Sequence, residues 1–315
     1  MGVLVFILCL LPLTGGYHMN LMKAESPGPS VSKLVPKVQS TAKILYTIYI
    51  ILTIVEIIFL LIGKMPLFDT LCLSFGTAGT GGFGIKNDSI ASYSTYNQVV
   101  ITVFMILFGI NFNAYYLLLT KKVMQAAKNE EVRYYLGIIG LAIVAIAINT
   151  REMFTSFGRA FQQAAFQVGS IITTTGYATT DFNVWPVFSK TILVILMFVG
   201  ACAGSTGGGI KVSRLLILCK SARKELQLYL HPNAVKKIKM DDKAIPHEVV
   251  RATNMFLFVY IMIFVTSLLI ISLDNLDMVS NFTAIAATLN NIGPGLGAVG
   301  PTGNLIRILI FPRLS

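Results

Sequence analysis

Three glycine-containing turns are the residues of this chain best suited to chemistry. They read Ala-Gly-Thr-Gly at 78–81, Thr-Thr-Thr-Gly at 173–176 and Asn-Asn-Ile-Gly at 290–293. Glycine reaches φ > 0 without steric cost, so successive carbonyl oxygens of such a turn can point toward one axis. A ring of backbone carbonyls can replace the water shell of a dehydrated alkali cation. The turns therefore indicate carbonyl coordination of a monovalent cation.

Each turn lies in an apolar stretch that is too short or too rich in glycine to cross a bilayer. These stretches are 66–84, 157–180 and 278–297. We expect each to begin with a short amphipathic helix, whose partly negative C-terminal end points at the turn. Non-helical backbone at membrane depth is tolerated only where protein or a water-filled cavity surrounds it. One such turn is more often a helix kink or a packing contact, but three with the same layout indicate a pore.

The composition identifies the surroundings of these turns. Charged residues make up 12% of the 315 residues and hydrophobic ones 55%, whereas a soluble domain carries about 25% charged residues. Windows long enough for a membrane helix are 44–62, 99–119, 187–218 and 252–273, with 135–149 as a fifth once its flanks are added. The predicted fold is an all-α integral membrane protein. Its repeated units of membrane helix, pore loop and membrane helix surround a central ion path.

The basic residues set the expected orientation. The loops 14–43, 120–133 and 211–251 hold 18 Lys and Arg, and the opposite loops hold 5. Because cytoplasmic loops are enriched in Lys and Arg, the pore loops are expected to enter from the extracytoplasmic side. Orientation thus accounts for the net charge of +11 without nucleic acid. No nucleophile–base pair or phosphate-binding loop is evident, so an enzyme is not expected.

Four motifs together resemble the Trk/Ktr/HKT superfamily of potassium transporters, and its bacterial TrkH branch in particular. Residues 173–182 resemble the third pore loop, 290–297 the fourth and 80–83 the second. The Ala-Gly-Ser-Thr-Gly-Gly-Gly-Ile-Lys sequence of 203–211 resembles the broken gating helix. The resemblance runs from residue 1 to about residue 304.

The resemblance implies a division of the chain into repeats around one filter. Residues 1–41 would end the first repeat and link it to the second, 42–133, which contains the pore loop 66–84. The third repeat would be 134–251, with pore loop 157–180, gate loop 200–210 and a basic cytoplasmic segment. The fourth would be 252–315, truncated after its pore loop.

The same resemblance assigns the ion path. One critical glycine from each loop would match Gly81, Gly176 and Gly293, with neighbouring backbone lining the path at Thr80, Thr174, Thr175, Asn291 and Ile292. The threonine hydroxyls would either add ligands or pin the loop to its helix. The gate would consist of Gly204, Ser205, Thr206, Gly207, Gly208 and Gly209. Three consecutive glycines cost roughly 1 kcal/mol each in a helix, so this segment unwinds easily; a simple kink is the alternative.

The resemblance also implies ligands and partners. K⁺ would be the transported ion, in a bacterial cytoplasmic membrane. A cytosolic nucleotide-binding, TrkA-like regulatory subunit would dock on the basic segment 220–251, which could instead contact anionic membrane lipids. A homodimer is expected, and no organic cofactor. Lys211 and Arg214 are expected to anchor the helix after the gate at the cytoplasmic interface.

The chain departs from the superfamily pattern at both ends. The first pore loop and the last membrane helix have no match here, so a fragment of a longer transporter is expected. The first loop is where glycine or serine separates K⁺ from Na⁺ preference, and sodium therefore stays open. A non-conducting membrane subunit that regulates another transporter is the alternative function, and a proton- or sodium-coupled secondary transporter is a weaker one.

Overall fold

Helices dominate the part of the chain that the computed structural model describes, residues 38–231 and 237–302. The expectations for residues 1–37, and with them the end of the first repeat, lie outside the described residues. The first group of helices is α3 (Val38–Ile62), α4 (Leu67–Ala78), α5 (Thr95–Phe108), α6 (Phe112–Leu119) and α7 (Val123–Ala127). A long helix, a short helix and a third helix therefore follow one another, as the sequence predicts for one repeat.

The same order recurs along the chain. The next group is α8 (Glu130–Asn149), η1 (Arg151–Met153), α9 (Phe157–Ile172), η2 (Phe182–Val184), α10 (Val187–Phe198) and α11 (Val212–Leu230). The last comprises the hairpin of β1 (Lys239–Met240) and β2 (Lys243–Ala244), then α12 (His247–Ile271), η3 (Ser272–Asp274), α13 (Met278–Leu289) and η4 (Gly297–Val299). The short helices α4, α9 and α13 thus occupy equivalent places, each after a long one.

Three described helices are long and apolar enough to cross a membrane: Lys43–Ile62, Glu130–Asn149 and His247–Asp274. They correspond to the predicted windows 44–62, 135–149 and 252–273. Large apolar side chains cover the outer face of α12, where Met255 and Phe258 are each 62% exposed. An outward apolar face of this kind belongs against lipid or another apolar protein surface. The fold is therefore that of an all-α membrane protein.

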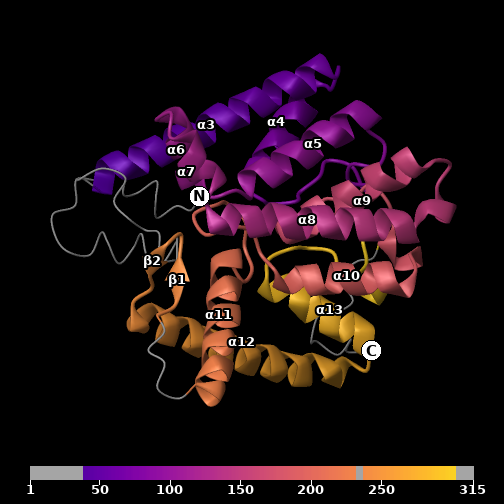
Figure 1. The fold of residues 1–315 in the computed structure, drawn as a ribbon. Helices are drawn as coiled ribbons and strands as arrows, with labels where there is room; N and C mark the ends of the chain where they lie inside the picture. The colour runs from indigo at the N-terminus through magenta and orange to yellow at the C-terminus, as the bar shows by residue number, and fades with distance from the viewer. Residues whose placement is uncertain (1–37, 232–236, 303–315) are drawn as a thin grey trace.

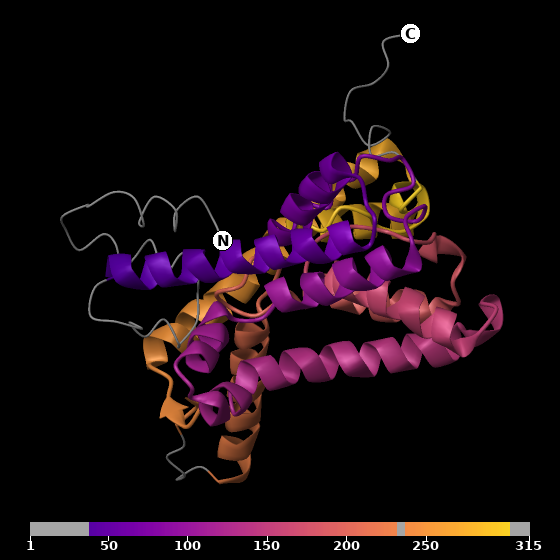
Figure 2. The same ribbon diagram turned by 90° about the horizontal axis from the view of Figure 1, so that it is seen from above.

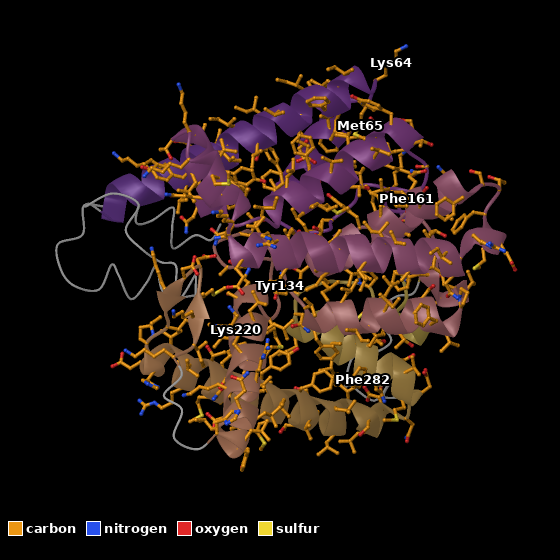
Figure 3. The ribbon with its side chains drawn as sticks, in the orientation of Figure 1. Lys64, Met65, Tyr134, Phe161, Lys220 and Phe282 are labelled. Atoms are coloured by element: carbon orange, nitrogen blue, oxygen red, sulfur yellow. The ribbon has the colours of Figure 1, made fainter. Side chains whose placement is uncertain are left out.

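The helix groups are joined by the packing of the short helices. Helix α9 packs against α5, and α13 against α10. Phe282 of α13 lies between Phe198 of α10 and Phe264 of α12, with ring centroids 5.9 and 5.1 Å apart (Figure 3). Helix α13 begins at Asp277, whose carboxylate accepts a hydrogen bond from Ser280 N at 3.0 Å. This hydrogen bonding to Ser280 lowers the pKa of Asp277, which keeps the cap ionised.

The window 99–119 differs from the straight span that the sequence predicts. Helices α5 and α6 meet at an angle of 90°. The segment after α10 packs into this break: Phe112 N donates to Gly204 O at 3.1 Å, and Cys202 N donates to Gly109 O at 3.0 Å. The bend is possible because these bonds satisfy backbone groups that a continuous helix would have paired internally.

The window 187–218 is broken, as predicted. Helix α10 ends at Phe198 and α11 begins at Val212, and we call the irregular residues 199–211 between them the gate segment. Helix α11 runs across the direction of α8, α10 and α12 in both views (Figures 1 and 2). The chain therefore changes direction at the gate segment, on the same end of the molecule as the β1–β2 hairpin (Figure 1).

The α5–α6 break yields a first prediction. A Cβ at Gly109 would overlap the buried hydroxyl of Tyr135, which donates to Ile106 O at 3.1 Å. We expect Gly109→Ala to lower the free energy of unfolding by about 1–3 kcal/mol through overpacking. The measurement is thermal unfolding in detergent. Gly137→Ala on α8 is the control, because its Cβ would meet no atom within 4 Å. Equal losses in both variants would contradict the packing described for the break.

Candidate functional site

The three predicted turns share one backbone conformation. Each contains a non-glycine residue in the left-handed region just beyond the end of its short helix, which is uncommon for such residues. These are Thr80, Thr174 and Asn291, with φ of 49°, 58° and 57°. A repeated conformation that is individually unfavourable persists only where surrounding structure enforces it.

The residues that follow continue the pattern. The next N–H folds back onto the short helix and donates to the carbonyl five residues earlier. The three bonds are Gly81 N to Gly76 O at 2.7 Å, Thr175 N to Ser170 O at 2.9 Å and Ile292 N to Ala287 O at 2.7 Å. A glycine with positive φ comes next in each turn: Gly82 at 67°, Gly176 at 87° and Gly293 at 115°.

This equivalence shifts the register expected for the second loop. Gly176 and Gly293 occupy the positive-φ position, whereas the loop 66–84 places Gly82 there instead of Gly81. Gly81 is equivalent to Thr175 and Ile292. Adjacent glycines look alike in the sequence, and the structure distinguishes them by the hydrogen bond of Gly81 to α4 and by the positive φ of Gly82.

The turns lie directly against one another. A Cβ on Gly82 would overlap the carbonyl oxygen of Thr175, and a Cβ on Gly176 would overlap that of Ile292. The turn around Gly82 therefore meets the turn around Gly176 in the same way that the latter meets the turn around Gly293. Successive turns related by the same contact are arranged around a common axis, and each turn follows the C-terminal end of a short helix, α4, α9 or α13. The partial negative charge of those ends favours a cation there.

Side-chain hydroxyls hold the turn at 173–176 in place. Thr173 Oγ1 donates to Gly169 O at 2.6 Å and lies 2.8 Å from Thr175 Oγ1. Tyr177 OH donates to Leu73 O of α4 at 3.2 Å. The hydroxyls of Thr173 and Thr175 are thus paired within the protein, which favours the pinning role. Among residues 38–231 and 237–302, no three His, Cys, Asp or Glu side chains are grouped as metal ligands.

The gate segment touches all three turns. Thr80 Oγ1 donates to Thr206 O at 3.2 Å, and Gly208 N donates to Thr174 Oγ1 at 2.6 Å. A Cβ on Gly208 would lie 2.8 Å from Asn290 O. The residues predicted as the gate, 204–209, therefore lie directly against the turns. A side chain larger than hydrogen has no room at Gly208.

The base of the gate segment is closed by backbone hydrogen bonds. Gly200 N donates to Ile210 O at 2.7 Å, and Val212 N donates to Ala201 O at 3.2 Å. The role predicted for Lys211 at the interface is wrong: this side chain is 7% exposed, and its ammonium donates to Gly207 O inside the segment. Burial of the charge is possible because a carbonyl of the loop accepts it.

One residue that the sequence reasoning did not single out belongs to this site. Glu131 is 2% exposed and accepts hydrogen bonds from Ala203 N at 2.6 Å, within the gate segment, and from Ser213 N at 3.1 Å, in the first turn of α11. Its signal in the sequence is an acidic residue at the start of an apolar window. Such a residue also reads as a favourable charge in the first turn of a helix, and its distant partners are backbone groups that leave no pattern.

The described residues define a membrane protein in which three short helices each end in a glycine-containing turn. The turns contact one another, and the irregular segment of a broken helix lies against them. A family model described as TrkH, cation transport protein, matches residues 1–142 and 134–312. The chain therefore belongs to the TrkH family. This is a family of transporters, in agreement with the expectation that the chain is not an enzyme.

Individual relatives carry the same description. The chain is 36% identical over 304 residues to the Trk system potassium uptake protein TrkH of Salmonella typhimurium, covering 95% of this chain and 63% of that protein. It is 38% identical over 307 residues to the TrkH of Vibrio parahaemolyticus. The crystal structure of the potassium transporter TrkH from Vibrio parahaemolyticus matches with a TM-score of 0.80 at 36% identity, over 89% of this chain and 61% of that one. The chain thus spans less than two thirds of these relatives.

The contact between filter turn and gate segment yields a second prediction. Thr174→Val removes the acceptor of the partly buried Gly208 N–H. We expect a loss of about 1–3 kcal/mol in the free energy of unfolding, measured by thermal unfolding in detergent. Thr174→Ser keeps the hydroxyl and is the matched control. If valine and serine behave alike, the hydrogen bond does not hold the segment to the turn.

Proposed function

We propose that this chain is the ion-conducting membrane subunit of a Trk-type potassium uptake system in the bacterial cytoplasmic membrane. The observation that carries the proposal is the backbone pattern repeated at three turns in mutual contact. Three copies of one uncommon conformation around an axis are explained by a ligand on that axis. The repeats 42–133, 134–251 and 252–315 would each contribute one turn.

The proposed filter consists of backbone carbonyls. Its lining residues are Thr80, Gly81, Gly82, Thr174, Thr175, Gly176, Asn291, Ile292 and Gly293. Removing water from a monovalent ion costs many kcal/mol in an apolar medium. Carbonyl oxygens can replace that water, and the partly negative ends of α4, α9 and α13 would add a favourable field. K⁺ enters this account as the transported ion, and no resident cofactor is required.

The gate segment, which includes residues 200–210, is the proposed moving part. It lies against Thr80, Thr174 and Asn290 at one end of the axis, where it would obstruct an ion leaving the filter. Its glycines lower the cost of rearranging the backbone. Conduction would then require the segment to withdraw while the turns keep their conformation.

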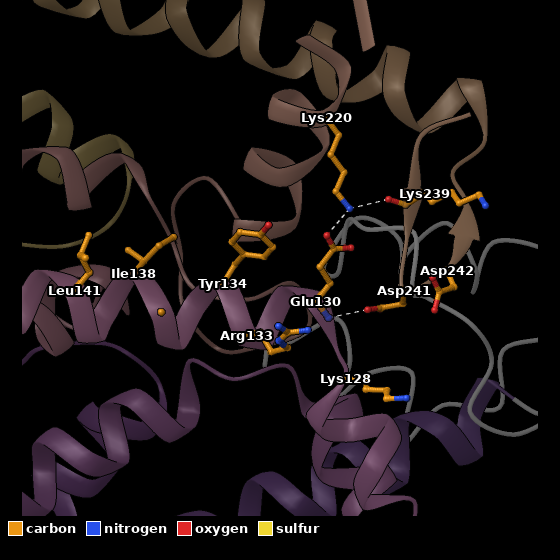
Figure 4. A pocket seen from close by; sticks show the side chains of 11 residues that line it. Lys128, Glu130, Arg133, Tyr134, Ile138, Leu141, Lys220, Lys239, Asp241 and Asp242 are labelled. Atoms are coloured by element: carbon orange, nitrogen blue, oxygen red, sulfur yellow. Dashed lines mark hydrogen bonds and ion pairs between the residues drawn. The ribbon is translucent and has the colours of Figure 1, made fainter. Parts of the chain in front are cut away.

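A regulatory partner is proposed at the end of the molecule that carries α11 and the β1–β2 hairpin. A pocket of about 960 Å³ opens there, and its charged lining consists of four basic and three acidic side chains: Lys128, Arg133, Lys220, Lys239, Glu130, Asp241 and Asp242 (Figure 4). The docked partner would be a cytosolic nucleotide-binding, TrkA-like subunit, with anionic lipid headgroups as a further contact. Assembly as a homodimer completes the proposal. Several relatives are named as parts of a Trk system, which supports an assembly.

Rubidium uptake by the full-length protein tests the filter. We expect Gly82→Ala to reduce uptake at least about tenfold, because a side chain at positive φ would also overlap Thr175 O. Gly81→Ala is the matched control, since it keeps the carbonyl and its Cβ would come no closer to another atom than 3.2 Å, at the exposed ring of Phe83. We expect it to retain most of the uptake. Gly176→Asp should abolish uptake without reducing expression.

Three outcomes would contradict the proposal. Unchanged uptake in Gly176→Asp would remove the turn from the ion path. Equal effects of Gly81→Ala and Gly82→Ala would overturn the register. A full-length protein that accumulates in the membrane, co-purifies with another transporter and shows no flux by itself would favour the non-conducting subunit instead.

A further inference from the structure

A buried carboxylate connects three separate parts of the chain at the gate segment. Glu131 Oε1 accepts from Ala203 N and from Ser213 N, and its Oε2 accepts from Asn111 Nδ2 at 3.2 Å. One side chain of α8 therefore holds the gate segment at Ala203, the start of α11 at Ser213 and the break between α5 and α6 at Asn111. The one remaining lone-pair direction, on Oε2, also lies in the protein interior, because Glu131 is 2% exposed.

The orientation of Asn111 makes a carboxylate the group that fits. Its Oδ1 accepts from Asn113 N at 2.9 Å as the cap of α6, so its Nδ2 must face Glu131. All three groups around residue 131 are then donors. A carboxylate accepts at both oxygens, whereas an amide would turn its own NH₂ toward one of these donors.

We propose that Glu131 is the positioning residue that fixes the backbone on both sides of residues 204–210 and so holds them against the turns. These residues are otherwise held by their contacts with the turns and by bonds within the gate segment. The effect of the movement on ion flow rests on the proposed function. The anchoring by Glu131 rests on its hydrogen bonds alone. Loosening Glu131 releases the segment from the turns and raises ion flow in the absence of a regulator.

The first turn of α8 places this residue next to the proposed docking end. Glu130 Oε1 lies 2.5 Å from Lys220 Nζ of α11. Asp241, in the β1–β2 turn, accepts from Glu130 N at 2.7 Å and from Asn129 Nδ2 at 3.2 Å (Figure 4). Adjacent residues of one helical turn thus bind the hairpin on one side and the gate segment on the other. A displacement of the β1–β2 hairpin would therefore move the first turn of α8, and with it Glu131, without involving the three turns.

A charge exchange between positions 131 and 111 tests the inference in the full-length protein. Glu131→Gln sets an amide against Asn111 Nδ2, and Asn111→Asp alone sets two carboxylates together. The double variant restores one acceptor for each donor and still caps α6. We expect Glu131→Gln to raise basal Rb⁺ flux without the regulator about threefold, by shifting the population of the segment. The double variant should return to the wild-type flux, with a K⁺ over Na⁺ preference unchanged throughout.

Amide hydrogen exchange over residues 200–213 gives a reading that does not depend on transport. Exchange should be about tenfold faster in Glu131→Gln, since its two anchoring amides open more readily, and should recover in the double variant. Glu152→Gln is the matched control, because Glu152 lies beyond the other end of α8 with its side chain 85% exposed. It should change neither measurement.

Each outcome decides between the two claims. Wild-type exchange and flux in Glu131→Gln would overturn the inference, as would a double variant no better than the single ones. If Glu131→Gln does not accumulate, recovery of accumulation and flux in the double variant supports the pairing, and failure of both overturns it. A wild-type protein with no Rb⁺ flux at all would refute the proposed function, while the exchange data would still report on Glu131.

Discussion

The structure depends on the requirement that backbone polar groups in an apolar interior find partners. The chain leaves helical conformation in three turns, at the ends of α4, α9 and α13. In each turn the backbone polar groups are paired in the same way. One N–H folds back onto the helix, and the next residue is a glycine at positive φ. The carbonyls of Thr175 and Ile292 then lie against the glycine of the neighbouring turn. Close backbone packing between turns follows from the absence of a side chain at Gly82 and Gly176.

The same requirement links the gate segment to the rest of the molecule. The break between α5 and α6 and the break between α10 and α11 each free backbone groups, and the two breaks pair with one another through Gly109, Phe112, Cys202 and Gly204. Glu131 and Lys211 supply the remaining partners from side chains. The gate segment is therefore built into the wall of the proposed pore, and its ends and its middle differ in how firmly they are held.

The sequence predicts the outline of this arrangement well, because long apolar windows and repeated glycine turns carry strong signals. It does not predict which of two adjacent glycines matters, since the sign of φ at Gly82 depends on the hydrogen bond that precedes it. The bend after Gly109 is also hidden, because the window 99–119 is largely apolar and the bend depends on residues about ninety positions later. The role of Glu131 is not predictable from the sequence for the same reason, because two of its three hydrogen-bond partners are backbone amides from a distant segment.

The central claim is that the three turns coordinate a dehydrated cation through backbone carbonyls. Crystals of the full-length protein grown in Rb⁺ test it directly, because the anomalous scattering of rubidium locates the ion. We expect a peak between the turns, within coordination distance of the carbonyl oxygens of Gly81, Thr175 and Ile292 or of the glycines that follow them. Rubidium found only outside the turns, or turns that stay in this conformation without any ion between them, would contradict the account.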